Sequence, residues 1–186
     1  MALELARALA ATERDDDFHI ARLLLLLAGH AGSRTKNKPM EGLTKLAKLD
    51  FLLRYPNCLE RALVASQVSP SEADVSAFER TTIESKMIRF RYGPWDHRYR
   101  RWVALMAARN LVDVGVAGRT VQIWLTPVGH DVVEMLTADA ALSTTAKRAT
   151  IVAKWFGSKS GSGLKGFVYD TFPELSNMKW GEEIAI

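Results

Sequence analysis

The residues best able to do chemistry are four histidines and one cysteine, and their spacing does not predict a reactive centre. None of His19, His30, His97 and His130 lies at metal-ligand spacing from another, so a zinc site would need distant residues brought together by the fold. With Cys58 as its single cysteine, the chain can form neither an internal disulfide nor a cysteine zinc cluster, which favours a reducing compartment. We therefore expect no metal and no cofactor.

Three short motifs match catalytic or ligand-binding sequences only in part. Asp96-His97 has the residue types of a catalytic pair, but neighbours on a helix point in different directions and Asp96 suits a helix N-cap. The stretch from Gly157 to Gly166 is glycine-rich with two lysines, yet it lacks the Gly-Lys-Ser/Thr ending of a P-loop. The acidic run Asp15–Asp17 is better explained by capping than by calcium binding. The sequence thus predicts a protein that is not an enzyme, with a catalytic role for His97 as the minor alternative.

Composition places the chain among ordinary globular proteins with a basic balance. Hydrophobic residues make up 48% and charged residues 25% of the sequence, while the net charge is +4 and the pI about 9.3. This balance permits nucleic acid or an acidic partner without requiring either. The apolar run Ile20–Ala28 is too short to span a bilayer, and acidic residues precede it where a signal peptide carries positive charge. We expect a cytoplasmic protein without membrane contact.

The central stretch has the element order of a winged helix-turn-helix. Met87–Tyr92 alternates basic and bulky apolar residues, a pattern typical of a half-buried strand. Asp96 can cap a helix that continues to about Asn110. Leu111–Val116 and Thr120–Leu125 form a predicted hairpin around Gly118, and Pro127 begins another helix. Helix, hairpin and helix in this order predict the winged-helix core.

Further helices are predicted on both sides of this core. The first is an alanine- and leucine-rich helix candidate over Ala2–Ala11. The others cover Phe18–Ala31, Met40–Tyr55, Asn57–Ser66, Glu72–Glu84, Ser143 or Thr144 to Phe156, and Leu164–Phe172, the last of which is ended by Pro173. The composition of Ser158–Gly163 predicts a flexible linker. The expected fold class is mainly α with a small β-sheet. We expect an N-terminal helical segment over residues 1–17, a winged-helix domain over 18–138 and a C-terminal helical extension over 139–186.

The predicted helix Met40–Tyr55 is apolar on nearly all sides, so it should be buried on more than one face. One face must serve the core, and the other can serve either the rest of the chain or a partner. Asp50 lies beside the apolar stripe and should find a hydrogen-bond partner. Phe51, Leu52, Tyr92, Trp95 and Trp180 are our candidates for a partner interface. The tail with Trp180 could add an edge strand or dock on a partner.

Arginines concentrate in the central stretch, and two interpretations of them stay open. They can be a solvated surface with local ion pairs, each contributing about 0 to 1 kcal/mol. They can instead form a phosphate-binding face made of the arginine strand, the helix and the tip of the hairpin. The candidate nucleic-acid-binding residues are Arg89, Arg91, Arg98, Arg101, Arg109 and Arg119.

Two segments together resemble a known family. The first is Gly42–Pro56 followed by Leu59–Leu63, and the second is Met87–Asp96 with Tyr99 and, further on, Leu125–Gly129. They are similar to the small middle component of bacterial ABC-three-component and Lamassu-type anti-phage defence operons. Those operons also encode an SMC-like ATPase and an effector, often a nuclease. The resemblance covers the chain from about Phe18 to Phe172.

The resemblance implies a non-enzymatic winged-helix subunit of an SMC complex in antiviral defence. Such a subunit would bridge the ATPase and the effector by protein–protein interaction, help to hold the effector inactive and be able to contact double-stranded DNA. The family has no catalytic residues to carry over. The residues alone leave a second function open, a winged-helix transcription regulator that binds operator DNA as a homodimer.

Overall fold

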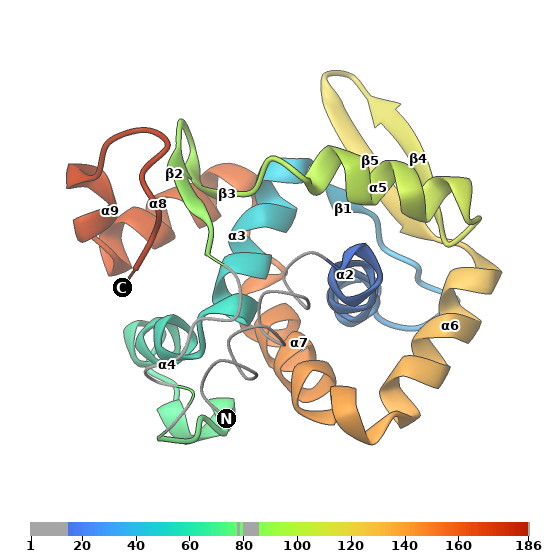
Figure 1. Cartoon of the computed structure of the whole chain (residues 1–186), viewed down its shortest axis with the longest axis horizontal. Helices are drawn as coiled ribbons and strands as arrows, with labels where there is room; N and C mark the ends of the chain where they lie inside the picture. Colours follow the sequence, from blue (N-terminus) through green and yellow to red (C-terminus); the bar gives the residue numbers. More distant parts are fainter. Residues whose placement is uncertain (1–14, 78, 80–85, 186) are drawn as a thin grey trace.

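The computed structural model describes residues 15–77, 79 and 86–185, and the chain is mainly helical with a small antiparallel sheet (Figure 1). The coarse part of the expected fold class is therefore confirmed. The helix predicted over Ala2–Ala11 lies outside the described residues. Among the described residues, no helix is both long and apolar enough to cross a membrane.

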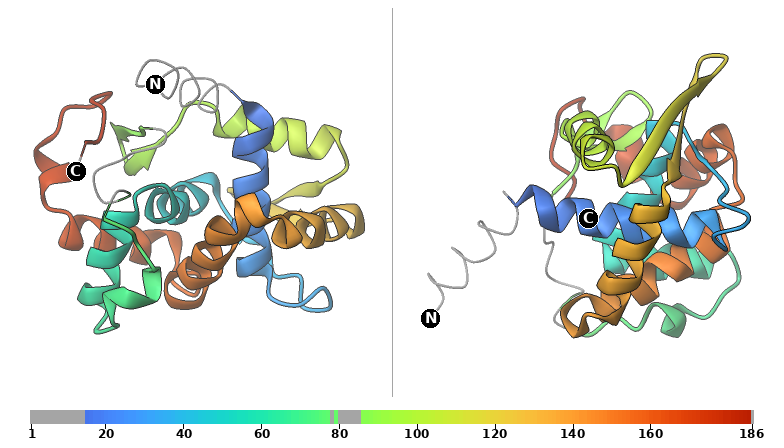
Figure 2. Two further views of the ribbon diagram at one scale, coloured as in Figure 1. Left: turned by 60° about the horizontal axis from the view of Figure 1, so that its bottom comes forward. Right: turned by 90° about the vertical axis from the view of Figure 1, so that its right-hand side faces the viewer.

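Helix α2 (Asp16–Ala31) occupies the centre of the molecule, where the other elements surround it (Figures 1 and 2). Its run of five leucines, Leu23–Leu27, is buried, and this burial supplies much of the hydrophobic core. The helix begins two residues earlier than predicted. Asp15 is the N-cap, because its carboxylate accepts a hydrogen bond from the Asp17 amide at 2.9 Å.

Helix α3 (Leu43–Arg54) is shorter than predicted because its first residues form a strand. Strand β1 (Met40–Glu41) pairs antiparallel with Ile123 and Gln122, so the prediction of a helix from Met40 is wrong. Gly42 has φ +89, a conformation that favours glycine and turns the chain from strand to helix. Every residue from Lys45 to Arg54 is buried, which confirms burial on more than one face.

The segment after α3 matches its prediction only in part. Helix α4 (Pro56–Ala65) confirms the predicted short helix. The helix predicted from Glu72 is wrong at its start, because a 3-10 turn, η1 (Pro70–Ala73), ends at Asp74 in the left-handed region with φ 48. The rest of that prediction falls largely on 78 and 80–84, outside the described residues.

Strand β2 (Ile88–Phe90) confirms the middle of the predicted arginine strand, but the break after it is a strand too. Gly93–Trp95 forms β3, which pairs antiparallel with β2 in a small hairpin. Pro94 is tolerated because a two-stranded ribbon leaves edges where no donor is needed.

The predicted helix, hairpin and helix are confirmed as α5 (Tyr99–Ala108), β4 (Val112–Ala117), β5 (Thr120–Leu125) and α6 (Pro127–Ala138). The sheet order is β1-β5-β4, so β4 is an edge strand, and the hairpin projects from the body (Figure 2). A Cβ at Gly129 would lie 2.0 Å from the Leu111 carbonyl oxygen. Glycine at this position therefore lets α6 pack closely against the start of the hairpin.

The C-terminal helices pack onto the same core as α2 and α3. Helix α7 (Ser143–Phe156), preceded by the short turn η2 (Ala140–Leu142), runs along α2 and confirms its prediction. Helix α8 (Gly161–Thr171) begins earlier than predicted, because Ser160 caps it by accepting a hydrogen bond from the Gly163 amide at 3.0 Å. The predicted flexible linker is therefore wrong in its second half.

The chain ends against the small hairpin. After α9 (Glu174–Asn177), the Ile184 amide donates to the Met87 carbonyl at 2.8 Å, and Glu183 forms an isolated bridge with Ile88. The Tyr55 hydroxyl donates to the Ile184 carbonyl at 3.0 Å. The sequence predicts that the tail either adds an edge strand or docks on a partner, and in the structure it pairs with the edge of β2.

Candidate nucleic-acid interface

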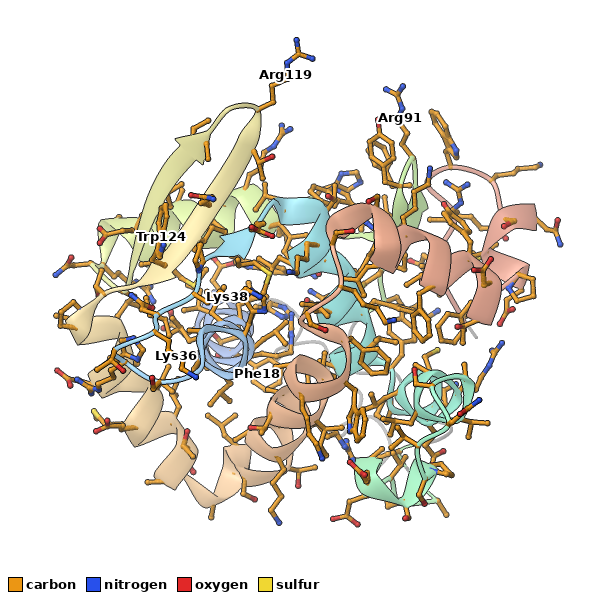
Figure 3. The ribbon with its side chains drawn as sticks, turned by 180° about the vertical axis from the view of Figure 1, so that it is seen from behind. Phe18, Lys36, Lys38, Arg91, Arg119 and Trp124 are labelled. Atoms are coloured by element: carbon orange, nitrogen blue, oxygen red, sulfur yellow. The ribbon has the colours of Figure 1, made fainter. Side chains whose placement is uncertain are left out.

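Two hairpins project from the same side of the molecule, and each carries an arginine at its tip. Arg119 lies at the end of β4–β5, and Arg91 lies at the turn of β2–β3; both side chains point outward (Figure 3). Between the hairpins lies an open groove with a volume of about 740 Å³, which we call the saddle. It is lined by the β4–β5 end (residues 117 and 119–122), the β1–α3 corner (41–44), Trp95, Arg100 and the start of α8 (161–162).

The saddle has a positive balance of charge. Arg100 and Arg119 line it, and its one acidic lining residue, Glu41, lies 3.9 Å from the ammonium of Lys45. The N-cap of α3 is Gly42, which has no side chain to cap the helix, and residues 42–44 line the saddle, so the positive end of the helix dipole also faces this surface. The arrangement suits an anion.

A smaller pocket of about 180 Å³ lies next to the saddle, and we call it the aromatic slot. It is lined by Phe90, Tyr92, Gly93, Pro94, Trp95, Thr44, Lys48 and Arg100. Three of these, Thr44, Trp95 and Arg100, also line the saddle, so the two depressions are neighbours. The rings of Phe90 and Trp95 are inclined by 28° with their centroids 6.3 Å apart, and Tyr92 is 45% exposed.

Lys48 is a buried cation that is hydrogen-bonded to a backbone carbonyl. It is 2% exposed, and its Nζ donates to the Thr44 carbonyl at 2.9 Å. Among the described residues, none of the ion pairs includes Lys48. Burial, followed by repulsion from Lys165, lowers the pKa of Lys48 from its usual 10.5 to about 8. The group still carries most of its charge at neutral pH.

The six candidate arginines separate into two groups. Arg98, Arg101 and Arg109 form ion pairs with carboxylates of Asp96, Asp16 and Asp17, at 2.8, 2.6 and 2.5 Å. Arg89 also turns inward, where its Nε donates to the Leu175 carbonyl at 3.0 Å. Arg91 and Arg119 are the two candidates at the hairpin tips.

Two cations of this surface, Lys48 and Arg100, are not among the residues that the sequence predicts to bind nucleic acid. A signal for each exists. Lys48 lies on a helix that the sequence predicts to be buried on more than one face, so burial of its charge could be expected. Arg100 begins an exposed side of α5 that continues with Ala104 and Ala107, small residues that permit close approach of another molecule.

Behind the saddle, a buried network of charges joins α2, α3 and α5. The carboxylate of Asp50 accepts hydrogen bonds from Arg22 at 2.8 and 3.2 Å, from Arg54 at 3.0 Å and from the Tyr99 hydroxyl at 2.6 Å. The predicted hydrogen-bond partner of Asp50 is thus confirmed. Burial alone would raise the pKa of Asp50, but the guanidinium groups of Arg22 and Arg54 hold it below 3.8.

The same network reaches the start of α5. Arg54 also donates to Asp96 at 3.0 Å, and the amide of Arg98 donates to Asp96 at 2.9 Å. The prediction that Asp96 is the N-cap of this helix is wrong, because the N-cap of α5 is Arg98, which makes no side-chain cap, and Asp96 instead closes the turn before it. Although burial opposes it, hydrogen bonds from Arg98 and the charge of Arg54 lower the pKa of Asp96. The network fixes the start of α5 in place, and the side chains of Asp50 and Arg54 at its centre are fully buried, which suits a positioning role.

No known protein-family model matches this chain. A search of curated proteins and a search of solved structures also find no significant match.

The histidines of the described residues do not converge on a site. Within that part of the chain, no group of three or more histidine, cysteine, aspartate or glutamate residues is arranged to hold a metal ion. His97 is exposed, with its ring edge-on to Phe90 at 6.4 Å. Burial raises the pKa of the Cys58 thiol to about 12, so this cysteine is a poor nucleophile.

The five interface candidates also divide by burial. Phe51 and Leu52 are fully buried, and the Phe51 ring packs against Phe172 at 5.4 Å, so their second face is covered by this chain itself. Tyr92 and Trp95 line the aromatic slot. Trp180 is 65% exposed and is the candidate most available to another protein.

Proposed function

We propose that this protein is a non-enzymatic winged-helix subunit of an SMC-like anti-phage defence complex, where it bridges the ATPase and a nuclease-type effector and contacts DNA through the saddle. One observation carries the proposal. The order α2, β1, α3, α5, β4, β5, with sheet order β1-β5-β4, is the order of three helices and three strands in a winged helix. Helix α4, η1 and the β2–β3 hairpin are then an insertion between the second and third helices.

The position of α5 supports the DNA part of the proposal. It immediately precedes the hairpin, which is the place of the helix that enters the major groove in this class of domain. The exposed side of α5 carries Arg100 followed by small residues, and the hairpin beside it carries Arg119. A basic, sterically open face of this kind is suited to a phosphate backbone.

The outer edge of the sheet supports the bridging part. Strand β4 is an edge strand, and Val114 and Val116 on it are exposed, Val116 by 71%. An uncovered apolar edge invites pairing with a strand from another chain. Together with Trp180, it gives the proposed subunit two separate surfaces for two protein partners.

Co-purification tests the bridging function. The chain is co-expressed with the SMC-like ATPase and the effector encoded beside it, and we expect one peak in size-exclusion chromatography. Val116→Glu with Trp180→Ala should separate the chain from at least one partner. The matched control is Val64→Glu on α4, an exposed valine away from both surfaces, which should leave the complex intact. Separate elution of the unaltered chain at micromolar concentration would contradict the proposal.

A homodimeric transcription regulator is the second candidate, and the same edge strand favours it. Two β4 edges can pair antiparallel across a twofold axis, which would place two α5 helices in one dimer. This function requires a symmetric dimer of the isolated chain and sequence-specific binding of operator DNA. Sedimentation of the isolated chain as a monomer, with only non-specific, salt-sensitive DNA affinity, would rule it out.

A further inference from the structure

We propose that the aromatic slot holds one unpaired nucleobase of a single-stranded nucleic acid, whose phosphates pass Lys48 and Arg100 and continue through the saddle toward Arg119. The inference goes beyond the duplex contact proposed for α5, because it assigns an unpaired strand to the slot, and it rests on the proposed function only for its biological setting. Its test uses the isolated chain, so it can fail while the defence complex still assembles, and it can succeed without that complex.

The first step is the need for an anion in the slot. An ammonium group taken out of water without a counter-charge is unfavourable, and Lys48 is in that position with one backbone carbonyl as its hydrogen-bond acceptor. Two of the donor positions of its ammonium have no partner among the described residues. Because Lys48 lines the slot, a phosphate oxygen entering there would supply both the charge and the acceptors.

The second step is the aromatic wall above that cation. Phe90 of β2, Tyr92 of the turn and Trp95 of β3 line the slot from one hairpin. Gly93, at the turn, has φ +118 and lies against the Lys48 side chain, where a Cβ would be 3.7 Å from Cε. A narrow pocket with ring walls suits one flat base, whereas a paired base in a duplex would stay outside it.

The third step is the continuity of positive charge beyond the slot. Lys48, Arg100 and Arg119 follow one another from the slot across the saddle to the hairpin tip, and the acidic Glu41 is paired with Lys45. Repeated cations along a groove match a polymer with a phosphate at every unit. A single carboxylate or an acidic side chain would use one of these positions and leave the others empty.

Fluorescence anisotropy of the isolated chain with labelled oligothymidylate, about a dozen residues long, tests this inference. We expect tighter binding of the single strand than of a duplex of equal length, and a steep loss of affinity with salt. Lys48→Met and Tyr92→Leu should each weaken binding of the single strand about tenfold. The matched controls are Lys147→Met, an exposed lysine on α7, and Trp155→Leu, a half-buried ring on the same helix; both should bind as the unaltered chain does.

Further measurements distinguish a nucleic-acid strand from other ligands of the slot. If free thymidine monophosphate competes as well per molecule as the oligonucleotide does, the slot takes a nucleotide and the proposed strand path is overturned. Equal affinity for duplex and single strand, or full affinity in both slot variants, would overturn the inference as a whole. Circular dichroism of each variant shows that it is folded, and Lys48→Met leaves the fold intact because it removes a charge and keeps the side-chain length.

Discussion

At the scale of single residues, the buried charge of Lys48 destabilises the folded state. A methionine at this position keeps the apolar stem and removes the uncompensated charge. We expect Lys48→Met to raise the free energy of unfolding by about 1 to 3 kcal/mol at pH 7, in line with the lowered pKa. Urea unfolding measures it. If the Lys48→Met variant has a lower free energy of unfolding than the unaltered chain, the ammonium group already has a compensating partner inside the protein.

The pH dependence of stability follows from the same group. In the unfolded chain Lys48 keeps its proton up to about pH 10.5, whereas in the folded chain it begins to lose it near pH 8. The unfolded state binds more protons in this window, so the contribution of Lys48 to stability rises between pH 8 and 10.5. Repulsion from the neighbouring cation Lys165 lowers the pKa of Lys48 in the same direction as burial. The difference in unfolding free energy between the Lys48→Met variant and the unaltered chain should therefore shrink over that window; a constant difference would contradict the assignment.

Asp50 is the opposite case, a buried charge whose partners are all present. Asp50→Asn would leave Arg22 and Arg54 without their shared carboxylate, and we expect a loss of about 3 to 5 kcal/mol in the free energy of unfolding. Because the pKa of Asp50 is lowered in the folded state, its contribution is present above about pH 4 and is lost as the pH falls through the folded pKa. As the pH falls, the free energy of unfolding should therefore decrease less steeply in the Asp50→Asn variant than in the unaltered chain. Asp113→Asn on the exposed face of β4 is the control, and equal losses in the two variants would contradict this role.

At the scale of elements, α5 is held by its buried face. Trp102 is fully buried, its Nε1 donates to Asp16 at 3.0 Å, and the guanidinium groups of Arg54 and Arg98 lie over its ring. Trp102→Ala should lower the free energy of unfolding by about 3 to 5 kcal/mol. The exposed Trp180→Ala should cost far less. A near-normal thermal melt of Trp102→Ala would show that α5 is not anchored through this face.

The elements also show what periodicity and capping can predict. Alternating residues in 111–125 predicted the hairpin, and proline after threonine predicted α6, because both signals are local. Met40–Glu41 and Gly93–Trp95 became strands only through pairing with segments that lie elsewhere in the chain or fold back on them. Composition alone suggested a linker at 158–163, but the Ser160 cap and the buried Leu164 stabilise a helix there.

The candidate site shows the same division between local and long-range signals. The exposure of Arg119 could be predicted from its place in a hairpin turn. The pairing of Arg101 and Arg109 with Asp16 and Asp17 could not, since more than 80 residues separate the partners in sequence. Likewise, nothing local shows that Lys48 would line a pocket together with Phe90 and residues 92–95.

At the scale of the whole molecule, the C-terminal helices complete the core around α2. Ala149 of α7 lies so close to α2 that a Cβ at Gly29 would be 3.1 Å from its carbonyl oxygen, and Val152 and Phe156 are buried beside it. A chain ending at residue 138 would uncover the leucines of α2. We expect it to lose cooperative thermal unfolding and to aggregate, as judged by circular dichroism and light scattering. A monomeric fragment with a sharp melt would contradict a shared core.

Photo-cross-linking of an oligonucleotide that carries iodouracil tests most directly the central claim that the saddle and the aromatic slot are the working surface. Mass spectrometry of the cross-linked peptides should place the adducts on Tyr92 and Trp95, with further adducts near Arg119. Adducts gathered instead around Arg101 and Arg109, on the side where α5 meets the start of α2, would contradict the account.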